Sequence, residues 1–173
     1  VSNHSTPQAI DALKEGAADL ALVTTPTVPS ASLTETAVRP IREAAVCSPD
    51  FSGLLGREVS LSELQDYPLI SLGSGTKSYE FYSALFTTHG LNYKPDIEAF
   101  TADQILPMVE ADLGIGFVPE EFLRKGDGVC RIRLKETIPE RSIVLIKRKE
   151  QPLSAAAREL ERMIRTQGQT ESS

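Results

Sequence analysis

The pattern of apolar and polar residues near the start of the chain predicts a helix followed closely by a buried strand. Apolar positions Ile10, Leu13 and Ala17 recur at helical spacing, and Gly16 is a natural helix terminator. A short apolar strand, 20–23, follows and opens into the small polar pair Thr24–Thr25. A strand of this kind presents hydroxyls and backbone amides at the carboxyl edge of a sheet, which is where open α/β sheets bind ligands.

A second helix–strand unit of the same type lies at 103–123 (DQILPMVEADLGIGFVPEEFL). Two such units in one chain predict two lobes that face each other across a cleft. Between and after them the pattern predicts helices at 61–67, 78–90 and 154–164, and strands at 68–72, 97–100, 113–118, 131–134 and 142–147. Alternating helices and short apolar strands favour α/β lobes with parallel sheets.

Extended segments near 40–46 and 136–143 are expected to carry the chain from one lobe to the other and back. Pro40 restricts its strand to a sheet edge or a bend. Subdomain I is therefore predicted at 1–42 plus 137–166 and subdomain II at 43–136, with a disordered polar tail at 167–173 (QGQTESS).

Composition narrows the choice of function. The net charge is −6 and the 18 basic residues are dispersed, so this chain is not expected to bind DNA by itself. The densest basic run, Lys147–Arg148–Lys149, is interpreted as a solvated strand edge.

Cys47 and Cys130 are interpreted as small buried hydrophobic residues of a protein in a reduced, cytoplasmic compartment, although the sequence does not exclude a disulfide. No apolar run approaches the ~20 residues of a membrane span, and the start at Val1 indicates a piece of a longer protein.

Candidate chemistry is sparse. The two histidines, His4 and His89, lie in unrelated segments without cysteines or carboxylates at ligand spacing, so neither a metal site nor a serine-nucleophile triad is expected. The turn Gly73–Thr76 lacks the lysine of a nucleotide-binding loop and is read equally as a plain turn or as a small-ligand contact. Thr24 and Thr25 have a similar pair of interpretations, since their side chains either cap local backbone groups or offer hydroxyls to a ligand. Phe100 is more typical of a core residue than of a pocket residue, and Thr101 of a helix cap.

Four motifs then occur in one order, each weak alone and strong as a set. They are L-x-x-G-x-x-D-L-A-L-V-x-x-P from Leu13, PLISLGSGT at 68–76, V-E-A-D-L-G-I-G-F-V-P-E at 109–120, and R-S-I-V-L-I-K-R-K with L-S-A-A-A-R-E-L at 141–160. The series resembles the effector-binding domain of LysR-type transcriptional regulators, and the resemblance runs from Val1 to about Arg165.

This resemblance implies an α/β, periplasmic-binding-protein-like (type 2) fold of two Rossmann-like subdomains joined by two crossover strands. It implies a domain that binds a small-molecule effector without catalysis, cofactor or metal. It also implies a homodimer of this domain within a tetrameric regulator, which contacts DNA only through an N-terminal winged-helix domain that this chain lacks. The family's ligand contacts carry over to Ser5, Thr6, Thr24, Thr25, Ser71, Gly73, Phe100 and Thr101, with Gly116 and Phe117 lining the floor.

Two departures from the family pattern accompany the resemblance. Asp112 stands where glycine is usual and is expected in the left-handed region, which Asp tolerates better than most residues. The family's first ligand-contacting loop precedes Val1. No Arg or Lys lies at the predicted ligand-binding edges, so a neutral or singly charged effector is expected. A free-standing solute-binding protein and an enzyme on a similar scaffold remain alternatives at this stage.

Overall fold

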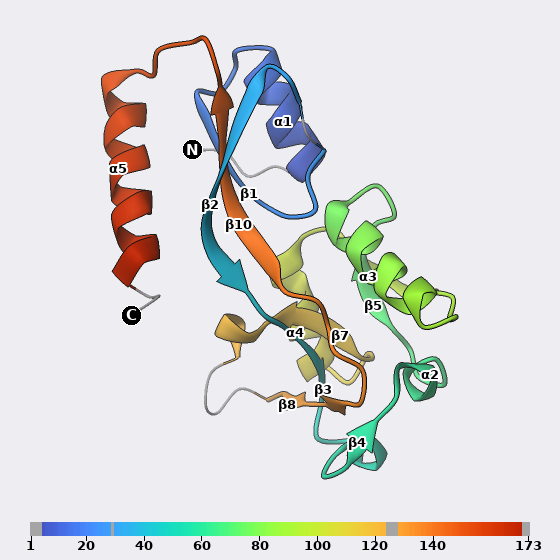
Figure 1. Cartoon of the computed structure of the whole chain (residues 1–173). Coiled ribbons are helices and arrows are strands. Elements are labelled where there is room, and N and C mark those ends of the chain that lie inside the picture. The colour runs from blue at the N-terminus through green and yellow to red at the C-terminus, as the bar shows by residue number, and fades with distance from the viewer. Residues whose placement is uncertain (1–4, 29, 124–127, 171–173) are drawn as a thin grey trace. The chain divides into compact units, whose positions relative to one another are not determined.

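The computed structural model describes residues 5–28, 30–123 and 128–170, and the chain divides into two compact units (Figure 1). Unit 1 comprises Val1–Ile41 and Arg141–Ser173, and unit 2 comprises Arg42–Glu140. The sequence places the end of the first segment of subdomain I at 42, where the structure has 41. It places the end of subdomain II at 136, where the structure has 140. The sequence also predicts that residues 1–4 end a strand, and these residues lie outside the described ones.

Unit 1 is built on a three-stranded sheet in the order β1–β10–β2, formed by β1 (Leu20–Thr24), β10 (Arg141–Arg148) and β2 (Leu33–Ile41). Both pairings are antiparallel. The expectation of a parallel sheet is therefore wrong here, because the strand that returns to unit 1 runs against both strands of the N-terminal segment. Pro40 lies in β2, an edge strand of this sheet, as expected for a residue without a backbone N–H.

Helix α1 (Thr6–Lys14) covers one face of this sheet. Residues 5–8 predict a helix start, because Ser5 with Gln8 fits a capping box and Thr6 before Pro7 fits an N-cap. The helix begins at this capping box, in which Gln8 Oε1 accepts hydrogen bonds from the Ser5 backbone N–H and hydroxyl. Ile10 and Leu13 pack against an apolar set from the three strands: Ala21, Val23, Leu33, Val144 and Ile146. Arg148 donates to the carbonyls of Leu13 and Ala18, so it secures the carboxyl end of α1 and is not the solvated residue expected from the sequence.

Helix α5 (Ala155–Thr170) lies beside β2 (Figure 1) and is joined to β10 by the Lys147–Glu161 ion pair at 2.8 Å. Lys147 alternates with Ile146 along β10, so α5 lies over the sheet face opposite to α1. Ser154 Oγ accepts from Ala157 N, as predicted for the helix start. The helix continues to Thr170, past the expected start of a disordered tail at 167, and 171–173 are outside the described residues.

Unit 2 contains a second antiparallel sheet, in the order β7–β3–β8, formed by β7 (Gly116–Pro119), β3 (Glu43–Cys47) and β8 (Cys130–Arg131). All five residues of the central strand β3 are buried. Two short strand pairs in the same unit are parallel, as expected: β4 (Glu58–Val59) with β9 (Arg133–Leu134), and β5 (Ile70–Leu72) with β6 (Ile97–Ala99). A parallel bridge between Leu69 and Ile115 links β5 to the segment that enters β7.

Short helices connect these strands. They are α2 (Leu61–Leu64), α3 (Lys77–Thr88) and α4 (Ile105–Glu110), with single 3₁₀ turns η1 (Ser52–Leu54), η2 (Ala102–Gln104) and η3 (Glu120–Phe122). The α2 and α3 ranges are shorter than predicted, because the residues that follow each helix make i→i−3 hydrogen bonds in place of α-helical ones, such as Tyr67 N to Leu64 O and His89 N to Phe86 O. The largest core of the unit contains an aromatic cluster, in which Tyr82 stacks on Phe117 at 4.7 Å between ring centroids and Phe86 contacts both Phe117 and Tyr93.

The turn between α4 and β7 contains the predicted left-handed residue. Asp112 has φ +60°, which confirms the expectation from the sequence, and its side chain is exposed. Two residues on, a Cβ on Gly114 would lie 2.4 Å from the Pro68 carbonyl oxygen. Glycine at 114 therefore permits the close approach that brings Ile115 N to that same oxygen at 2.8 Å.

Replacing Asp112 tests this turn. Asp112→Gly should stabilise unit 2 by about 0.5–1 kcal/mol, because glycine adopts φ > 0 without a Cβ clash, whereas Asp112→Ala should destabilise it by about 1 kcal/mol. All four tyrosines, at 67, 79, 82 and 93, belong to unit 2, so tyrosine fluorescence during urea unfolding reports on this unit. An alanine variant with a midpoint at or above that of the glycine variant would contradict the assignment.

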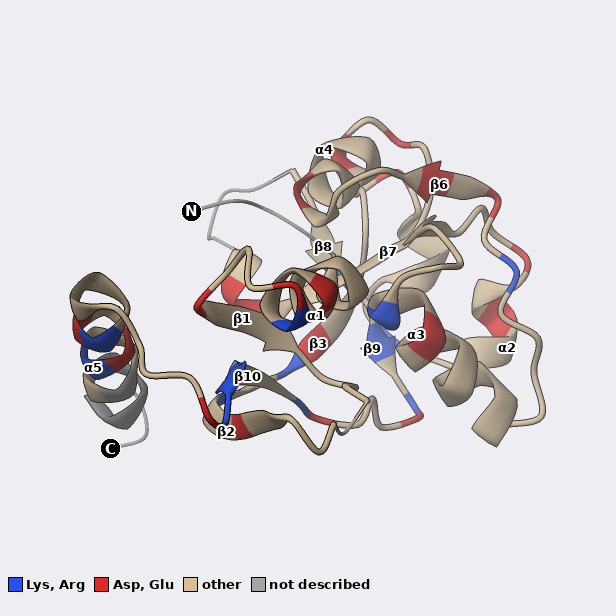
Figure 2. Ribbon diagram, turned by 90° about the horizontal axis from the view of Figure 1, so that it is seen from above, with Lys and Arg blue, Asp and Glu red and all other residues tan. Residues whose placement is uncertain are grey.

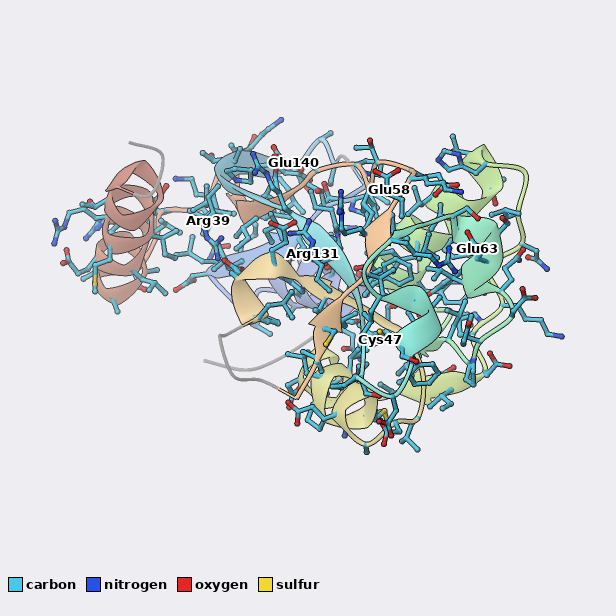
Figure 3. All side chains as sticks on the ribbon, turned by 90° about the horizontal axis from the view of Figure 1, so that it is seen from below. Arg39, Cys47, Glu58, Glu63, Arg131 and Glu140 are labelled. Atoms are coloured by element: carbon cyan, nitrogen blue, oxygen red, sulfur yellow. The ribbon has the colours of Figure 1, made fainter. Side chains whose placement is uncertain are left out.

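Glu63 links the stability of unit 2 to pH. Its carboxylate accepts from the Ser60 backbone N–H at 3.0 Å and pairs with Arg57 at 2.7 Å, and these contacts lower its pKa to about 2 (Figure 3). A carboxyl whose pKa is lower in the folded state stabilises that state fully above its unfolded value of 4.5 and loses the effect as pH falls toward 2. The urea midpoint from tyrosine fluorescence should therefore drop over this range, and less so in Glu63→Gln.

Glu58→Gln is the matched control, since Glu58 lies nearby on β4 and its carboxylate has no bonding partner among the described residues. Its pH profile should follow that of the unchanged chain. Identical profiles for Glu63→Gln and the unchanged chain would remove Glu63 from this role.

Candidate functional site

The carboxyl end of β1 brings two predicted ligand-binding threonines next to an arginine. Arg141, at the start of β10, donates from Nε to the Thr25 carbonyl oxygen at 2.6 Å and from Nη2 to Thr24 Oγ1 at 3.0 Å. Thr25 Oγ1 in turn accepts from the Ser142 backbone N–H at 2.9 Å, and Thr25 N donates to Ser142 O. The antiparallel register of β1 and β10 produces these contacts between residues more than a hundred positions apart in the chain.

These bonds determine which role each hydroxyl can play toward a ligand. Thr24 Oγ1 and Thr25 Oγ1 each accept a protein hydrogen bond, and neither hydroxyl hydrogen has an acceptor among the described residues. A threonine hydroxyl carries one hydrogen, so each side chain retains a donor. Arg141 is only 4% exposed, and its guanidinium lies beside both threonines. The cluster therefore favours a ligand group that accepts hydrogen bonds.

Ser5 and Thr6 lie at the same end of unit 1. Helix α1 packs on β1 through Ile10 and Leu13, and a short connection reverses the chain between them, so the start of the helix lies beside the end of the strand. Both residues are half-buried. The first turn of α1 carries no acidic residue, and the partial positive charge of a helix N-terminus has the same sign as Arg141.

In unit 2 the structure brings four predicted residues together at the carboxyl ends of the parallel strands β5 and β6. Ser71 pairs with Glu98 and Leu72 with Ala99, so Gly73 follows one strand where Phe100 and Thr101 follow the other. Phe100 is 92% exposed, which differs from the core position that its residue type favours. Thr101 is the N-cap of η2, and Gln104 Oε1 accepts from the backbone N–H groups of Phe100 and Thr101.

The chain around Gly73 is closely packed. A Cβ at this position would lie 2.7 Å from Glu98 Oε1, and the Gly73 carbonyl accepts from both the backbone N–H and the hydroxyl of Thr76. Ser71 is buried, and its hydroxyl donates to the Leu72 carbonyl at 3.0 Å. Burial raises the pKa of neighbouring Tyr93 to about 12, against the opposing effect of the Ser71 hydroxyl, so Tyr93 stays protonated and neutral at physiological pH.

Gly116 and Phe117 lie inside unit 2. A Cβ on Gly116 would lie 2.6 Å from the Ile105 side chain and 3.0 Å from Val109, and Phe117 stacks on Tyr82 in the aromatic core. Both residues pair with β3. They hold β7 and α4 in place and are not at the exposed edge formed by Gly73, Phe100 and Thr101.

Unit 2 also has a groove of about 710 Å³ between β3, β4 and the segment 131–140 (Figure 3). It carries charges of both signs, including the ion pairs Arg131–Glu120 at 2.5 Å and Arg42–Glu140 at 3.6 Å. None of the predicted ligand contacts lines it. Lys and Arg are likewise spread over both units and do not gather on one helix of the described chain (Figure 2).

Two further site types are absent from residues 5–28, 30–123 and 128–170. No group of three or more His, Cys, Asp or Glu side chains in these ranges is placed to hold a metal ion. No helix within them is long and apolar enough to cross a bilayer.

Comparison with known proteins identifies the family. The family model for the LysR substrate binding domain matches residues 1–169 of the 173. The chain belongs to this family. It is therefore the effector-sensing domain of a LysR-type transcriptional regulator, with the type 2 periplasmic-binding-protein-like fold. No relative is found among curated protein sequences.

Solved structures of low sequence identity share the fold of this LysR substrate-binding domain. The effector binding domain of QuiR in complex with shikimate matches with a TM-score of 0.83 at 18% identity, over 96% of this chain and 79% of that one. The regulatory domain of CcmR from Synechocystis PCC6803 in complex with 2-PG matches with a TM-score of 0.79 at 14% identity, over 94% and 79%. A BenM effector binding domain variant gives 0.76 at 20% identity, over 98% and 80%.

Sequence reasoning missed Arg141 as a neighbour of the candidate site. The residue opens the motif R-S-I-V-L-I-K-R-K, but nothing local to it indicates that its strand pairs with β1. The statement that no Arg or Lys lies at the ligand-binding edges is therefore wrong, and the expectation of a neutral or singly charged effector loses this argument.

The bond from Ser142 N to Thr25 Oγ1 gives a test of the geometry in unit 1. Thr25→Val removes the acceptor and leaves a part-buried N–H unpaired, which costs about 1–3 kcal/mol. Exchange of the Ser142 amide hydrogen, followed by NMR, should accelerate roughly 5- to 150-fold. Thr36→Val on β2 is the control, because the Thr36 hydroxyl makes no hydrogen bond among the described residues, and its exchange should be unchanged. Equal Ser142 exchange in both variants would contradict the contact.

Proposed function

We propose that this LysR domain senses a small effector bearing a carboxylate, which is recognised in unit 1 at the carboxyl end of β1. The observation that carries the proposal is the contact of Arg141 with Thr24 and Thr25. The contact orients two hydroxyl donors and places a buried cation beside them. Unlike a neutral group, a carboxylate accepts from several donors and gains from the positive charge.

Unit 2 has its own edge of predicted contact residues, which supports a proposal that this unit also recognises a ligand. Thr101 and Phe100 follow β6, Gly73 follows β5, and the exposed ring of Phe100 offers an apolar surface for a hydrocarbon portion. The nearby Glu98 carboxylate favours hydroxyl or amine donors over a second carboxylate. Ser71, Gly116 and Phe117 support this edge from within the unit.

The family supports further proposals about the regulator. LysR-type domains bind effectors and oligomerise. We infer a homodimer of this domain, a tetramer of the full regulator, DNA contact through a winged-helix domain, a cytoplasmic location and no catalysis. The acidic net charge of −6 fits a domain that leaves DNA contact to another part of the protein.

Thr24→Val tests the carboxylate proposal. Small carboxylates are screened for stabilisation of the chain, and the binder found is measured by titration calorimetry together with its primary amide. Losing one hydrogen bond to a charged group costs about 1.5–3 kcal/mol, so the carboxylate should bind roughly 10- to 150-fold more weakly to Thr24→Val. The amide, which lacks the charge, should bind the unchanged chain less tightly than the carboxylate does and lose less in the variant.

Two matched variants control this experiment. Thr24→Ser keeps the hydroxyl and should restore most of the affinity, and Thr36→Val should bind like the unchanged chain. Thr6→Val and Thr101→Val extend the test to the starts of α1 and η2, with melting temperature recorded because loss of a cap alone costs about 1 kcal/mol. Equal carboxylate affinity for Thr24→Val and the unchanged chain would overturn the proposal.

A further inference from the structure

The two cysteines of the chain lie directly opposite each other on neighbouring strands of unit 2. Cys47 ends β3 and Cys130 begins β8, and the antiparallel register pairs Val46 with Arg131 and Cys47 with Cys130. Residues paired across a sheet project to the same face. Cys47 belongs to the main core of unit 2 and Cys130 packs against that same core, so both thiols lie on one side of the strand pair (Figure 3 labels Cys47).

The backbone hydrogen bonds define the type of pair. Ile132 N donates to the Ala45 carbonyl at 2.8 Å, and hydrogen-bonded and non-hydrogen-bonded pairs alternate along an antiparallel ladder. Cys47 and Cys130 therefore form a hydrogen-bonded pair, for which Cα atoms are typically ~5.5 Å apart. This separation falls within the ~4.4–6.8 Å that disulfides span.

The two thiols differ in access. Cys47 is fully buried, and burial together with the neighbouring Cys130 raises its pKa to about 11, which keeps it protonated and unreactive toward solutes. Cys130 is only half-buried. An oxidant in solution therefore reaches Cys130 first, while Cys47 is held beside it.

We propose that Cys47 and Cys130 are a reversible disulfide site that responds to hydroperoxides. Cys130 sulfur takes the terminal oxygen of the hydroperoxide, whose O–O bond breaks to release an alcohol, or water from hydrogen peroxide, and becomes a sulfenic acid. Cys47 sulfur then attacks the Cys130 sulfur, the S–O bond breaks, and the oxygen leaves as water with the thiol proton. Two thiols are oxidised and one peroxide is reduced, and exchange with a dithiol reductant restores both thiols.

The position of the pair gives this bond a structural consequence. β3 begins one residue after Arg42, the first residue of unit 2, and Cys130 lies ten residues before its last, Glu140 (140 − 130). The disulfide would fasten the segment by which the chain leaves the unit to the strand by which it enters. It would also close a loop that contains most of unit 2, including all four tyrosines, and so restrict the unfolded chain.

The test uses the reduced chain treated with hydrogen peroxide and analysed by intact mass and thiol titration. The expected product is a monomer that has lost both thiols and the mass of two hydrogens, and that dithiothreitol returns to the starting mass. Its urea midpoint from tyrosine fluorescence should be higher than that of the reduced chain. In Cys47→Ala, the sulfenic acid at Cys130 should persist and be captured by dimedone, and in Cys130→Ser the buried Cys47 should stay unmodified at the same peroxide dose.

A second measurement uses the reduced, unchanged chain, so its result depends neither on oxidation nor on the folding of a variant. Phenylarsine oxide bridges two close thiols, so it should add once to the reduced, unchanged chain and take up both titratable thiols. The proposal is overturned if phenylarsine oxide leaves both thiols titratable. It is also overturned if peroxide gives only dimedone-reactive or over-oxidised Cys130, or only dimers linked between chains.

Discussion

Unit 1 depends on one pairing, the insertion of β10 between β1 and β2. This strand is distant in sequence from its two neighbours, yet it contributes Val144 and Ile146 to the apolar layer on which α1 packs. The same strand carries Arg141 at one end and Arg148 at the other. Arg141 contacts the carboxyl end of β1, whereas Arg148 holds the carboxyl end of α1. The pairing of β10 with β1 and β2 therefore both forms the core of unit 1 and assembles its polar cluster.

Unit 2 has a comparable constraint in β3. Because every residue of this strand is buried, its register against β7 and β8 allows little variation. The register places Phe117 in the aromatic core, sets Gly116 against α4, and pairs Cys47 with Cys130. A glycine is needed at 116 because helix α4 approaches the strand so closely that a methyl group would overlap Ile105. The exposed edge at Thr101 rests on this packing, since η2 leads directly into α4.

Features encoded within a few residues were accessible from the sequence. The Ser5–Gln8 capping box, the strand before Thr24, the edge position of Pro40 and the left-handed Asp112 all follow from local patterns, and each is found in the structure. Ordered motifs identified the family and with it the two-lobed fold. Of the candidate site, the sequence supplied the residues Thr24, Thr25, Gly73, Phe100 and Thr101 through family likeness, and the structure places them at strand ends. Their role in binding stays a prediction.

What the sequence did not show depends on pairing between distant strands. Strand direction in unit 1, the contact of Arg141 with Thr24 and the opposition of Cys47 to Cys130 all require the register of β10 or β8, for which no local signal exists. Gly116 and Phe117 illustrate the same limit, since an apolar strand next to a ligand-binding motif has the same sequence whether it lines a pocket or fills a core.

The two chemistries inferred for this domain belong to different units. Carboxylate recognition rests on Arg141, Thr24 and Thr25 in unit 1, and disulfide formation on Cys47 and Cys130 in unit 2. A disulfide that fastens the exit of unit 2 changes effector affinity only if it alters a state that the effector distinguishes. The reference case is that effector affinity is the same in the reduced and in the disulfide-bonded domain, and a regulatory link is measured as a departure from it.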